Sequence, residues 1–148
     1  MLDPEARAAL AQIDLIDDAL VPGRPGFDLT RTRREQRAQG KALSRAGIAL
    51  PVARATDLDA DGVRCRMFAP QGPAPVVVYV HGGGWALGSP EECEPFCRLL
   101  TLRSGWATIA PDYRLAPEHP YPAALEDIER VLAWLRDRGE SLELDTSR

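Results

Sequence analysis

The residues best suited to chemistry are three consecutive glycines, Gly82, Gly83 and Gly84, which follow His81 and precede Trp85. Glycine adopts positive φ at no steric cost and lets another group approach the backbone closely. Three in a row therefore predict a loop that presents main-chain N–H groups to a ligand. Phosphate-binding loops fit poorly, because neither G-x-G-x-x-G nor G-x-x-x-x-G-K-[ST] can be read from Gly82 onward.

An apolar run, Val76 to Val80, leads directly into this loop. A run of β-branched and aromatic residues without polar alternation predicts a strand covered on both faces, as in the middle of a parallel sheet. Open α/β sheets bind their ligands at the carboxyl ends of such strands. We therefore expect the glycines to lie at a ligand-binding edge, and we regard an ordinary Gly-rich turn as the weaker alternative.

A second group of polar side chains lies in the loop "PDYRLAPEHPYP", which contains four prolines. Its charged and titratable members are Asp112, Arg114, Glu118 and His119. Charge pairs in a stiff loop usually hold its geometry, so we interpret these residues as structural rather than catalytic.

Cys93 and Cys97 are spaced i, i+4, so on a helix they share one face. Structural metal sites need about four ligands, and no matching pair of His or Cys accompanies these two. We therefore interpret them as helix packing and predict no metal site. The total of three cysteines is odd, which fits a reducing compartment better than a disulfide framework.

Composition narrows the class of protein further. A chain of 148 residues with 45% hydrophobic content can bury a single core. The net charge of −4 gives no reason to expect nucleic acid or an anionic membrane as partner. No apolar stretch approaches 18 residues, and the start "MLDPEARAAL" does not resemble a signal peptide. We expect a cytoplasmic protein without a cofactor, and the sequence leaves its oligomeric state open.

The elements that position these residues follow from periodicity and turn signals. Two helices are expected first, from Asp3 to Leu20 and from about Asp28 to Arg45. Val52–Leu58 and Val63–Phe68, separated by a turn that ends in Asp-Gly, predict a β-hairpin. Trp106–Ala110 is a further candidate parallel strand.

Two more helices alternate with these strands. Ser89 is the expected N-cap of one helix, with an apolar face made by Phe96, Leu99, Leu100 and Leu102. A second helix is expected to end at Gly139, with an apolar face made by Ala124, Leu125, Ile128, Val131, Leu132 and Leu135. Strand, helix, strand, helix predicts an α/β fold with a mainly parallel sheet.

Two long motifs carry a family resemblance, "HGGGW" at 81–85 and "DYRLAPEHPYPAALED" at 112–127. Together they resemble the hormone-sensitive-lipase-like family of α/β-hydrolase esterases, over roughly Val52 to Arg148. The resemblance implies the N-terminal half of an α/β-hydrolase fold, with residues 51–148 as a partial core and residues 1–50 as a helical cap. It also implies hydrolysis of a small-molecule carboxylic ester by a Ser-Asp/Glu-His triad.

The resemblance assigns roles to the glycine loop. Gly82 and Gly83 match the family's donors to the oxyanion, and Gly84 is the residue whose freedom lets the loop turn. By its place before the glycines, His81 is expected to brace the loop rather than to transfer protons. Trp85 is expected either to line the acyl pocket or to pack against the loop.

The sequence departs from the family in its catalytic residues. None of the five serines, at positions 44, 89, 104, 141 and 147, is flanked as Gly-x-Ser-x-Gly. His119 does not match the triad histidine, which comes later in the family. We therefore expect a chain truncated before the nucleophile elbow and inactive by itself, with an unpaired apolar strand edge that lowers its solubility. The alternatives are a non-catalytic ligand-binding protein or receptor on this scaffold, and an amidase or arylformamidase.

Overall fold

The computed structural model describes residues 25–43 and 50–147, and its contacts divide the chain into two compact units, residues 1–35 and 36–148. Helix α2 spans Leu29–Leu43. It begins one residue after Asp28, whose carboxylate accepts a hydrogen bond of 3.0 Å from the backbone N–H of Arg31, as an N-cap residue does. The helix expected from Asp3 to Leu20 lies outside the described residues. The division into cap and core at residue 50 stays a prediction.

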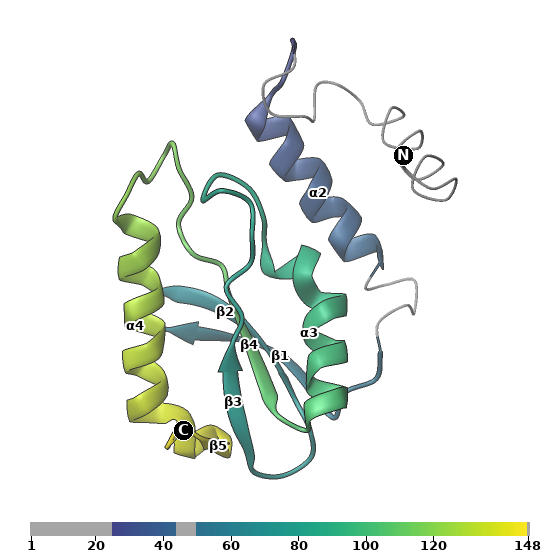
Figure 1. The fold of residues 1–148 in the computed structure, drawn as a ribbon, viewed down its shortest axis with the longest axis vertical. Coiled ribbons are helices and arrows are strands. Elements are labelled where there is room, and N and C mark those ends of the chain that lie inside the picture. Colours follow the sequence, from purple (N-terminus) through teal and green to yellow (C-terminus); the bar gives the residue numbers. More distant parts are fainter. Residues whose placement is uncertain (1–24, 44–49, 148) are drawn as a thin grey trace, which may run out of the picture. The chain divides into compact units, whose positions relative to one another are not determined.

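Five strands form one sheet, drawn in Figure 1. They are β1 (Arg54–Ala60), β2 (Val63–Ala69), β3 (Ala74–Val78), β4 (Ala107–Pro111) and β5 (Leu144–Asp145), in the spatial order β1-β2-β4-β3-β5. β2 pairs antiparallel with β1 and β4, whereas β3 pairs parallel with β4 and β5. The α/β fold with antiparallel first strands is confirmed, and the described sheet is mixed.

The hairpin turns at the Asp-Gly pair. Asp61 and Gly62 have φ of 54° and 84°, and the backbone N–H of Gly62 donates to the Asp59 carboxylate at 2.8 Å. Positive φ at both central residues is the geometry that a two-residue hairpin loop needs. This local signal is why the hairpin could be predicted.

The strand covered on both faces is β4, not the strand before the glycine loop. All five residues of β4 are buried, whereas Val76 to Tyr79 are half-buried and Val80 is 46% exposed. The expectation that Val76–Val80 is fully covered is therefore wrong. The reason is its place in the sheet, because among the described residues β5 pairs with β3 only at Ala74 and Pro75. Whether this edge lowers solubility stays a prediction.

The two remaining long helices cover opposite faces of the sheet (Figure 1). Helix α3 spans Pro90–Ser104 and helix α4 spans Ala123–Arg138. Alternate residues of a strand point to opposite faces. On β2, Cys65 and Met67 therefore belong to the cluster beneath α4, whereas Phe68 belongs to the cluster beneath α3.

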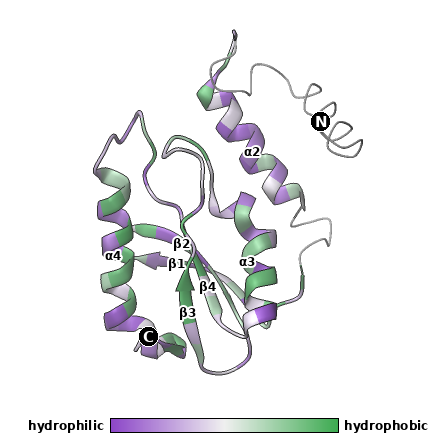
Figure 2. Cartoon of the chain, viewed as in Figure 1, coloured by the Kyte–Doolittle hydropathy of each residue, from purple (hydrophilic) through white to green (hydrophobic). Residues whose placement is uncertain are grey.

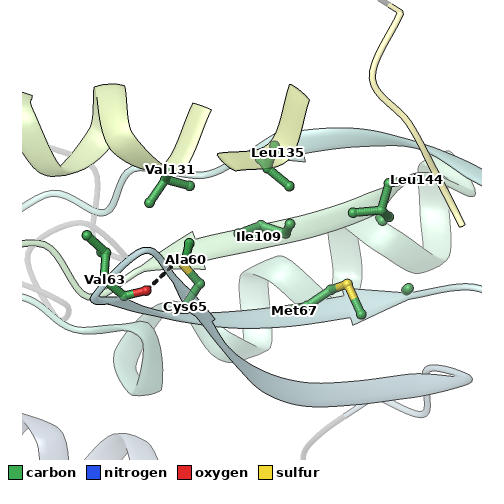
Figure 3. Packing of buried hydrophobic residues seen from close by; sticks show 10 residues of the cluster. Ala60, Val63, Cys65, Met67, Ile109, Val131, Leu135 and Leu144 are labelled. Atoms are coloured by element: carbon green, nitrogen blue, oxygen red, sulfur yellow. Dashed lines mark hydrogen bonds between the residues drawn. The ribbon is translucent and has the colours of Figure 1, made fainter. Parts of the chain in front are cut away.

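The larger core lies between the sheet and α4 (Figure 3). Val131 and Leu135 point from α4 onto Cys65, Met67 and Ile109 of the central strands, and all five side chains are at most 3% exposed. Val131 and Leu135 were expected on the buried face. Leu125 and Leu132, also expected there, are 45% and 44% exposed, so the buried stripe is narrower than the run of apolar residues.

Helix α3 buries a different face from the one expected. Phe96, Leu99 and Leu102 are 50%, 40% and 45% exposed, and the hydrophobic stretches of α3 are visible in Figure 2. The buried positions are instead Pro90, Glu91, Glu94, Cys97 and Thr101. The physical reason is that β2 presents Arg64 and Arg66 on this side of the sheet, and a helix with two glutamates toward it can pair with them.

Two expected helix ends also differ in detail. Ser89 has the extended backbone of an N-cap, but its hydroxyl donates to the Glu92 carboxylate at 2.8 Å rather than capping a backbone N–H. Gly139 does not stop α4 in the left-handed region. It has φ −57° and begins a 3₁₀ turn, Gly139–Leu142. A Cβ at Gly139 would lie 2.5 Å from the Thr146 side chain, so glycine is needed there for close approach.

None of the helices in the described segments is long and apolar enough to span a membrane.

Candidate functional site

The glycine loop follows β3 and turns sharply at its centre. Gly83 and Gly84 have φ of 124° and 59°, and Trp85 also has a positive φ, 58°. The carbonyl of Gly83 accepts hydrogen bonds from the backbone N–H groups of Ala86 and Leu87, at 3.1 and 2.9 Å. A non-glycine residue at positive φ is uncommon, so Trp85 is held there by the turn.

The N–H groups of the three glycines are not used inside the described part of the chain. Gly82, Gly83 and Gly84 are exposed, and among the described residues none of them donates a backbone hydrogen bond. The N–H groups that follow, those of Ala86 and Leu87, are bound to Gly83. The glycines therefore offer free N–H donors beyond the carboxyl end of β3.

At two positions, Gly83 and Gly88, neighbouring atoms lie too close to leave room for a side chain. A Cβ on Gly83 would lie 2.2 Å from the Leu87 carbonyl oxygen, and a Cβ on Gly88 would lie 2.2 Å from His81 Nδ1. By contrast, a Cβ on Gly82 or Gly84 would meet no described atom within 4 Å. Gly84 therefore needs glycine only for its positive φ. The sequence reading missed Gly88, because its constraint comes from a residue seven positions earlier.

His81 is buried against the loop. Its Nδ1 lies 2.9 Å from the Gly82 carbonyl oxygen, so the neutral tautomer that fits carries its proton on Nδ1. The Tyr113 hydroxyl donates to the His81 carbonyl at 2.7 Å, and the two rings stack with centroids 4.3 Å apart. His81 Nε2 is buried without a described partner. These contacts are the ones that a bracing role for His81 requires.

The polar residues of the second loop take part in ion pairs. Arg64 Nη2 lies 2.7 Å from the Asp112 carboxylate and 2.9 Å from that of Glu91, so one guanidinium joins the end of β4 to the start of α3. Arg114 binds the buried Asp127 through its side chain at 2.9 Å and through its backbone N–H at 2.8 Å. This arrangement agrees with a structural role for Asp112 and Arg114.

The pKa of Asp127 reflects these contacts. Burial by itself would raise the pKa of this carboxyl, but the side-chain and backbone hydrogen bonds from Arg114 outweigh it, helped by the charges of Arg114 and Arg130. The pKa of Asp127 is therefore below its ordinary value. The loop that faces the glycines is thus anchored to α4 by an ionised carboxylate.

Two pockets flank the glycine loop. The first, the Trp85 pocket, has a volume of about 440 Å³ and is lined almost wholly by apolar groups, including Trp85, Ala116, His119, Tyr121 and Leu125. The second, the His81 pocket, has a volume of about 350 Å³ and a mixed lining that includes Tyr79, His81, Gly82, Glu92 and Cys93. Trp85 is 61% exposed, so it forms a rim of the first pocket rather than part of the core.

The described residues contain no group of three or more His, Cys, Asp or Glu side chains able to hold a metal ion. His119 lies in the Trp85 pocket, whereas His81 lies in the other. The two histidines are therefore not brought together.

Comparison with known proteins shows which family the chain resembles. Residues 77–148 match the family model of the α/β-hydrolase fold. The esterase LipI of Mycobacterium tuberculosis is 37% identical over 107 residues, which are 66% of this chain and 33% of that protein. The carboxylesterase NlhH of the same organism is 45% identical over 74 residues, which are 50% of this chain and 23% of that protein.

Solved structures agree with the sequence relatives. An esterase from Pyrobaculum calidifontis superposes with a TM-score of 0.78 at 32% identity, over 98% of this chain and 46% of that one. An ester hydrolase from the metagenome of Lake Arreo gives a TM-score of 0.78 at 31% identity, over 100% of this chain and 49% of that one.

The chain thus spans about a third or less of the curated relatives named above and just under half of the solved structures. Over that span the chain matches its relatives both in sequence and in fold. The chain belongs to the α/β-hydrolase family, in its hormone-sensitive-lipase-like branch.

Proposed function

We propose that the glycine loop supplies oxyanion donors in an α/β-hydrolase that cleaves carboxylic esters. The observation that carries this proposal is the set of unused N–H groups on Gly82 and Gly83, exposed at the carboxyl end of β3. When a nucleophile attacks an ester carbonyl, the oxygen becomes an anion, and donors already in place stabilise it without reorganising. HGGG-type loops are a known source of such donors in lipases and esterases.

The rest of the loop has a supporting role in this proposal. Gly84 permits the turn, while the contact between His81 and Tyr113 holds the glycine loop against the second loop, which follows β4. One oxyanion donor typically contributes about 10²–10³ in kcat, or roughly 3–4 kcal/mol. A displacement of the loop that misdirects both N–H groups would therefore remove most of the activity.

The substrate class follows from the relatives. They include an esterase, a carboxylesterase and an arylesterase, and these names support a small-molecule carboxylic ester as substrate rather than an amide. The apolar Trp85 pocket, about 440 Å³ in volume, is in the range of small-molecule sites. It supports a role for Trp85 beside the apolar part of the substrate, with simple packing as the alternative.

The nucleophile is a separate matter. None of the five serines of the 148-residue sequence lies in Gly-x-Ser-x-Gly. We therefore propose that this chain contributes the oxyanion loop and not the catalytic triad. The chain by itself is then expected to hydrolyse nitrophenyl acetate no faster than background. Turnover that survives purification and disappears in Gly83→Val would contradict this proposal.

The role of the loop can be tested where a nucleophile is present. Residues 77–147 would replace the matching segment of carboxylesterase NlhH, and kcat would be measured with a nitrophenyl ester and the corresponding anilide. We expect an active chimera that prefers the ester. In it, Gly83→Ala should lower kcat by about 10²–10³, because the added Cβ meets the Leu87 carbonyl and displaces the donors.

A glycine variant away from the loop serves as the control in the same chimera. Gly105→Ala introduces an alanine at positive φ at the end of α3, where its Cβ would meet no described atom within 4 Å. It should retain kcat within a few-fold. A folded chimera in which Gly83→Ala behaves like this control would refute the oxyanion role, and a preference for the anilide would indicate an amidase.

A further inference from the structure

Two thiols lie in contact on α3, next to the glycine loop. Cys97 is fully buried and Cys93 is partly exposed, and their Sγ atoms are 3.8 Å apart. The Cys97 thiol donates toward Cys93 Sγ, and the Cys93 thiol donates toward the Pro90 carbonyl at 3.5 Å. Cys93 also lines the His81 pocket, so the Cys93 thiol can be reached from that side, with Cys97 directly behind it.

The spacing of the two sulfurs suits a one-atom bridge better than a disulfide. Helix residues four apart hold their Cβ atoms about 5–6 Å apart, whereas a disulfide needs about 3.5–4.5 Å. Disulfide formation would therefore distort α3. Two sulfurs bound to one atom at about 2.3 Å lie roughly 3.2–3.8 Å apart for bond angles between about 90° and 110°, so the 3.8 Å between Cys93 and Cys97 Sγ requires at most a small approach of the two sulfurs.

The number of ligands limits which atom can bridge them. A structural zinc ion needs about four protein ligands, and the described residues offer no group of three His, Cys, Asp or Glu side chains. An atom that is satisfied by two sulfurs and brings its own third substituent therefore fits this pair better than a structural zinc ion. A trivalent arsenic that carries one organic group has this requirement.

We propose that Cys93 and Cys97 form a dithiol site that binds trivalent organoarsenicals, entered through the His81 pocket. The pocket, with a volume of about 350 Å³, has room for a phenyl-sized substituent on the arsenic. The site depends on the two thiols and the pocket alone, and it does not require the proposed esterase function.

The reaction balances without an oxidant. An arsenoxide, R–As=O, reacts first with the accessible Cys93 thiol and then with Cys97. Two As–S bonds form, the As=O bond is lost, and both thiol protons leave with the oxygen as water, while arsenic stays trivalent. The hydrogen bond to Cys93, and then burial, raise the pKa of Cys97, so its thiol still holds the proton that the second step releases.

Binding of an arsenical is expected to affect the glycine loop, because Gly82 and His81 line the same pocket as Cys93. The organic group on the arsenic would occupy this pocket, against the ring of His81. A covalent adduct on the dithiol is therefore expected to alter the surroundings of His81 but not those of His119, which lies in the Trp85 pocket.

The test uses phenylarsine oxide and the 148-residue chain. After addition of one equivalent, intact-mass measurement should show one phenylarsenic group per chain, retained in excess 2-mercaptoethanol and removed by 2,3-dimercaptopropanol. Alkylation in urea after the reaction should label Cys65 and leave Cys93 and Cys97 protected. Adducts that protect Cys65, or a chain that binds no arsenical, would overturn the proposal.

Serine variants supply the matched comparison. Cys93→Ser and Cys97→Ser should each release the arsenical on the order of 10²-fold faster than the unchanged chain, because the second thiol acts at high effective concentration. Cys65→Ser should behave like the unchanged chain. Equal release from all three variants would refute chelation by the pair, and far-UV circular dichroism would verify that each variant keeps its helices.

A spectroscopic measurement on the unchanged chain needs no variant. The sequence contains two histidines, so its imidazole NMR signals are few. Formation of the adduct should shift the signals of His81 and leave those of His119 in place. Shifts confined to His119, or none at all, would show that the arsenical does not occupy the His81 pocket.

Discussion

The hydroxyl of Tyr113 donates a hydrogen bond of 2.7 Å to the main-chain carbonyl of His81, and the rings of these two residues are stacked. Tyr113 follows β4 and His81 follows β3, and these strands are parallel neighbours in the sheet. The contact therefore joins the two motifs of the sequence, 32 residues apart along the chain. It holds the first residue of the glycine loop against the second loop.

Replacement of Tyr113 by Phe should loosen this connection. The variant leaves the buried His81 carbonyl without its donor, and an unsatisfied buried polar group costs about 1–3 kcal/mol. We expect the free energy of unfolding, measured in urea, to fall by that amount. Tyr121→Phe is the matched control, since Tyr121 is 85% exposed. Equal stability of the two variants would show that the Tyr113 bond contributes nothing measurable.

Gly88 offers a test of close packing under the loop. An alanine there would place its Cβ 2.2 Å from His81 Nδ1 and 2.5 Å from the Gly82 carbonyl oxygen. Overpacking of this kind typically costs about 1–3 kcal/mol, in addition to roughly 1–2 kcal/mol for an alanine at left-handed φ. Gly105 also has a positive φ, but a Cβ there would meet no described atom within 4 Å. Gly105→Ala should therefore lose only the stability that a left-handed alanine costs. Thermal unfolding of both variants would separate the two effects.

Replacing Glu94 should lower the stability of the fold, because this residue of α3 pairs with Arg66 of β2. Its carboxylate is 2% exposed and lies 2.9 Å from Arg66 and 2.7 Å from Arg98. Removing one partner of a buried ion pair typically costs about 3–5 kcal/mol, and we expect Glu94→Gln to approach the lower end because both arginines reach solvent. Glu129→Gln, at an exposed position of α4, should change stability by less than about 0.5 kcal/mol. Urea unfolding measures both, and similar values would argue against a buried pair at Glu94.

Asp127 should make the stability of the fold depend on acidity. Because its pKa is lowered in the folded chain, its stabilising contribution is complete above the ordinary carboxyl pKa of about 3.9 and is lost as pH falls through the folded pKa. Asp127→Asn should be less stable at pH 7 and should lose less stability than the unchanged chain between about pH 5 and pH 3.

The same pH series can identify the partner responsible. Arg114→Gln removes the side-chain hydrogen bonds and the charge of Arg114, which lower the pKa of Asp127. The free energy of unfolding of this variant should therefore also fall less between about pH 5 and pH 3 than that of the unchanged chain. If Arg114→Gln keeps the full acid sensitivity of the unchanged chain, the dependence arises elsewhere.

Much of the fold could be predicted because its signals are local. The Asp61-Gly62 turn, the start of α2 near Asp28 and the alternation of strands with helices each depend on a few adjacent residues. The position of the glycine loop after a strand is of the same kind. The free N–H groups of that loop could be anticipated for the same reason, since three glycines in sequence have no side chains to cover them.

The partners of these elements could not be predicted in this way. Phe96, Leu99 and Leu102 form an apolar face on α3, yet the sheet receives Glu91 and Glu94 instead, because β2 brings Arg64 and Arg66 to that side. Local periodicity measures the hydrophobicity of a helix face. It does not reveal the charges on the strand that the helix will meet.

The family, the order of the elements and the backbone freedom at residues 82–84 can be read from the amino-acid sequence alone, because each is encoded by neighbours along the chain. The contact of Tyr113 with His81 and the placement of α3 so that Cys93 lines the His81 pocket could not be read in this way. The contact of Tyr113 depends on β4 lying beside β3 in the sheet. Pairing of strands distant in sequence sets it, and such pairing leaves no local pattern.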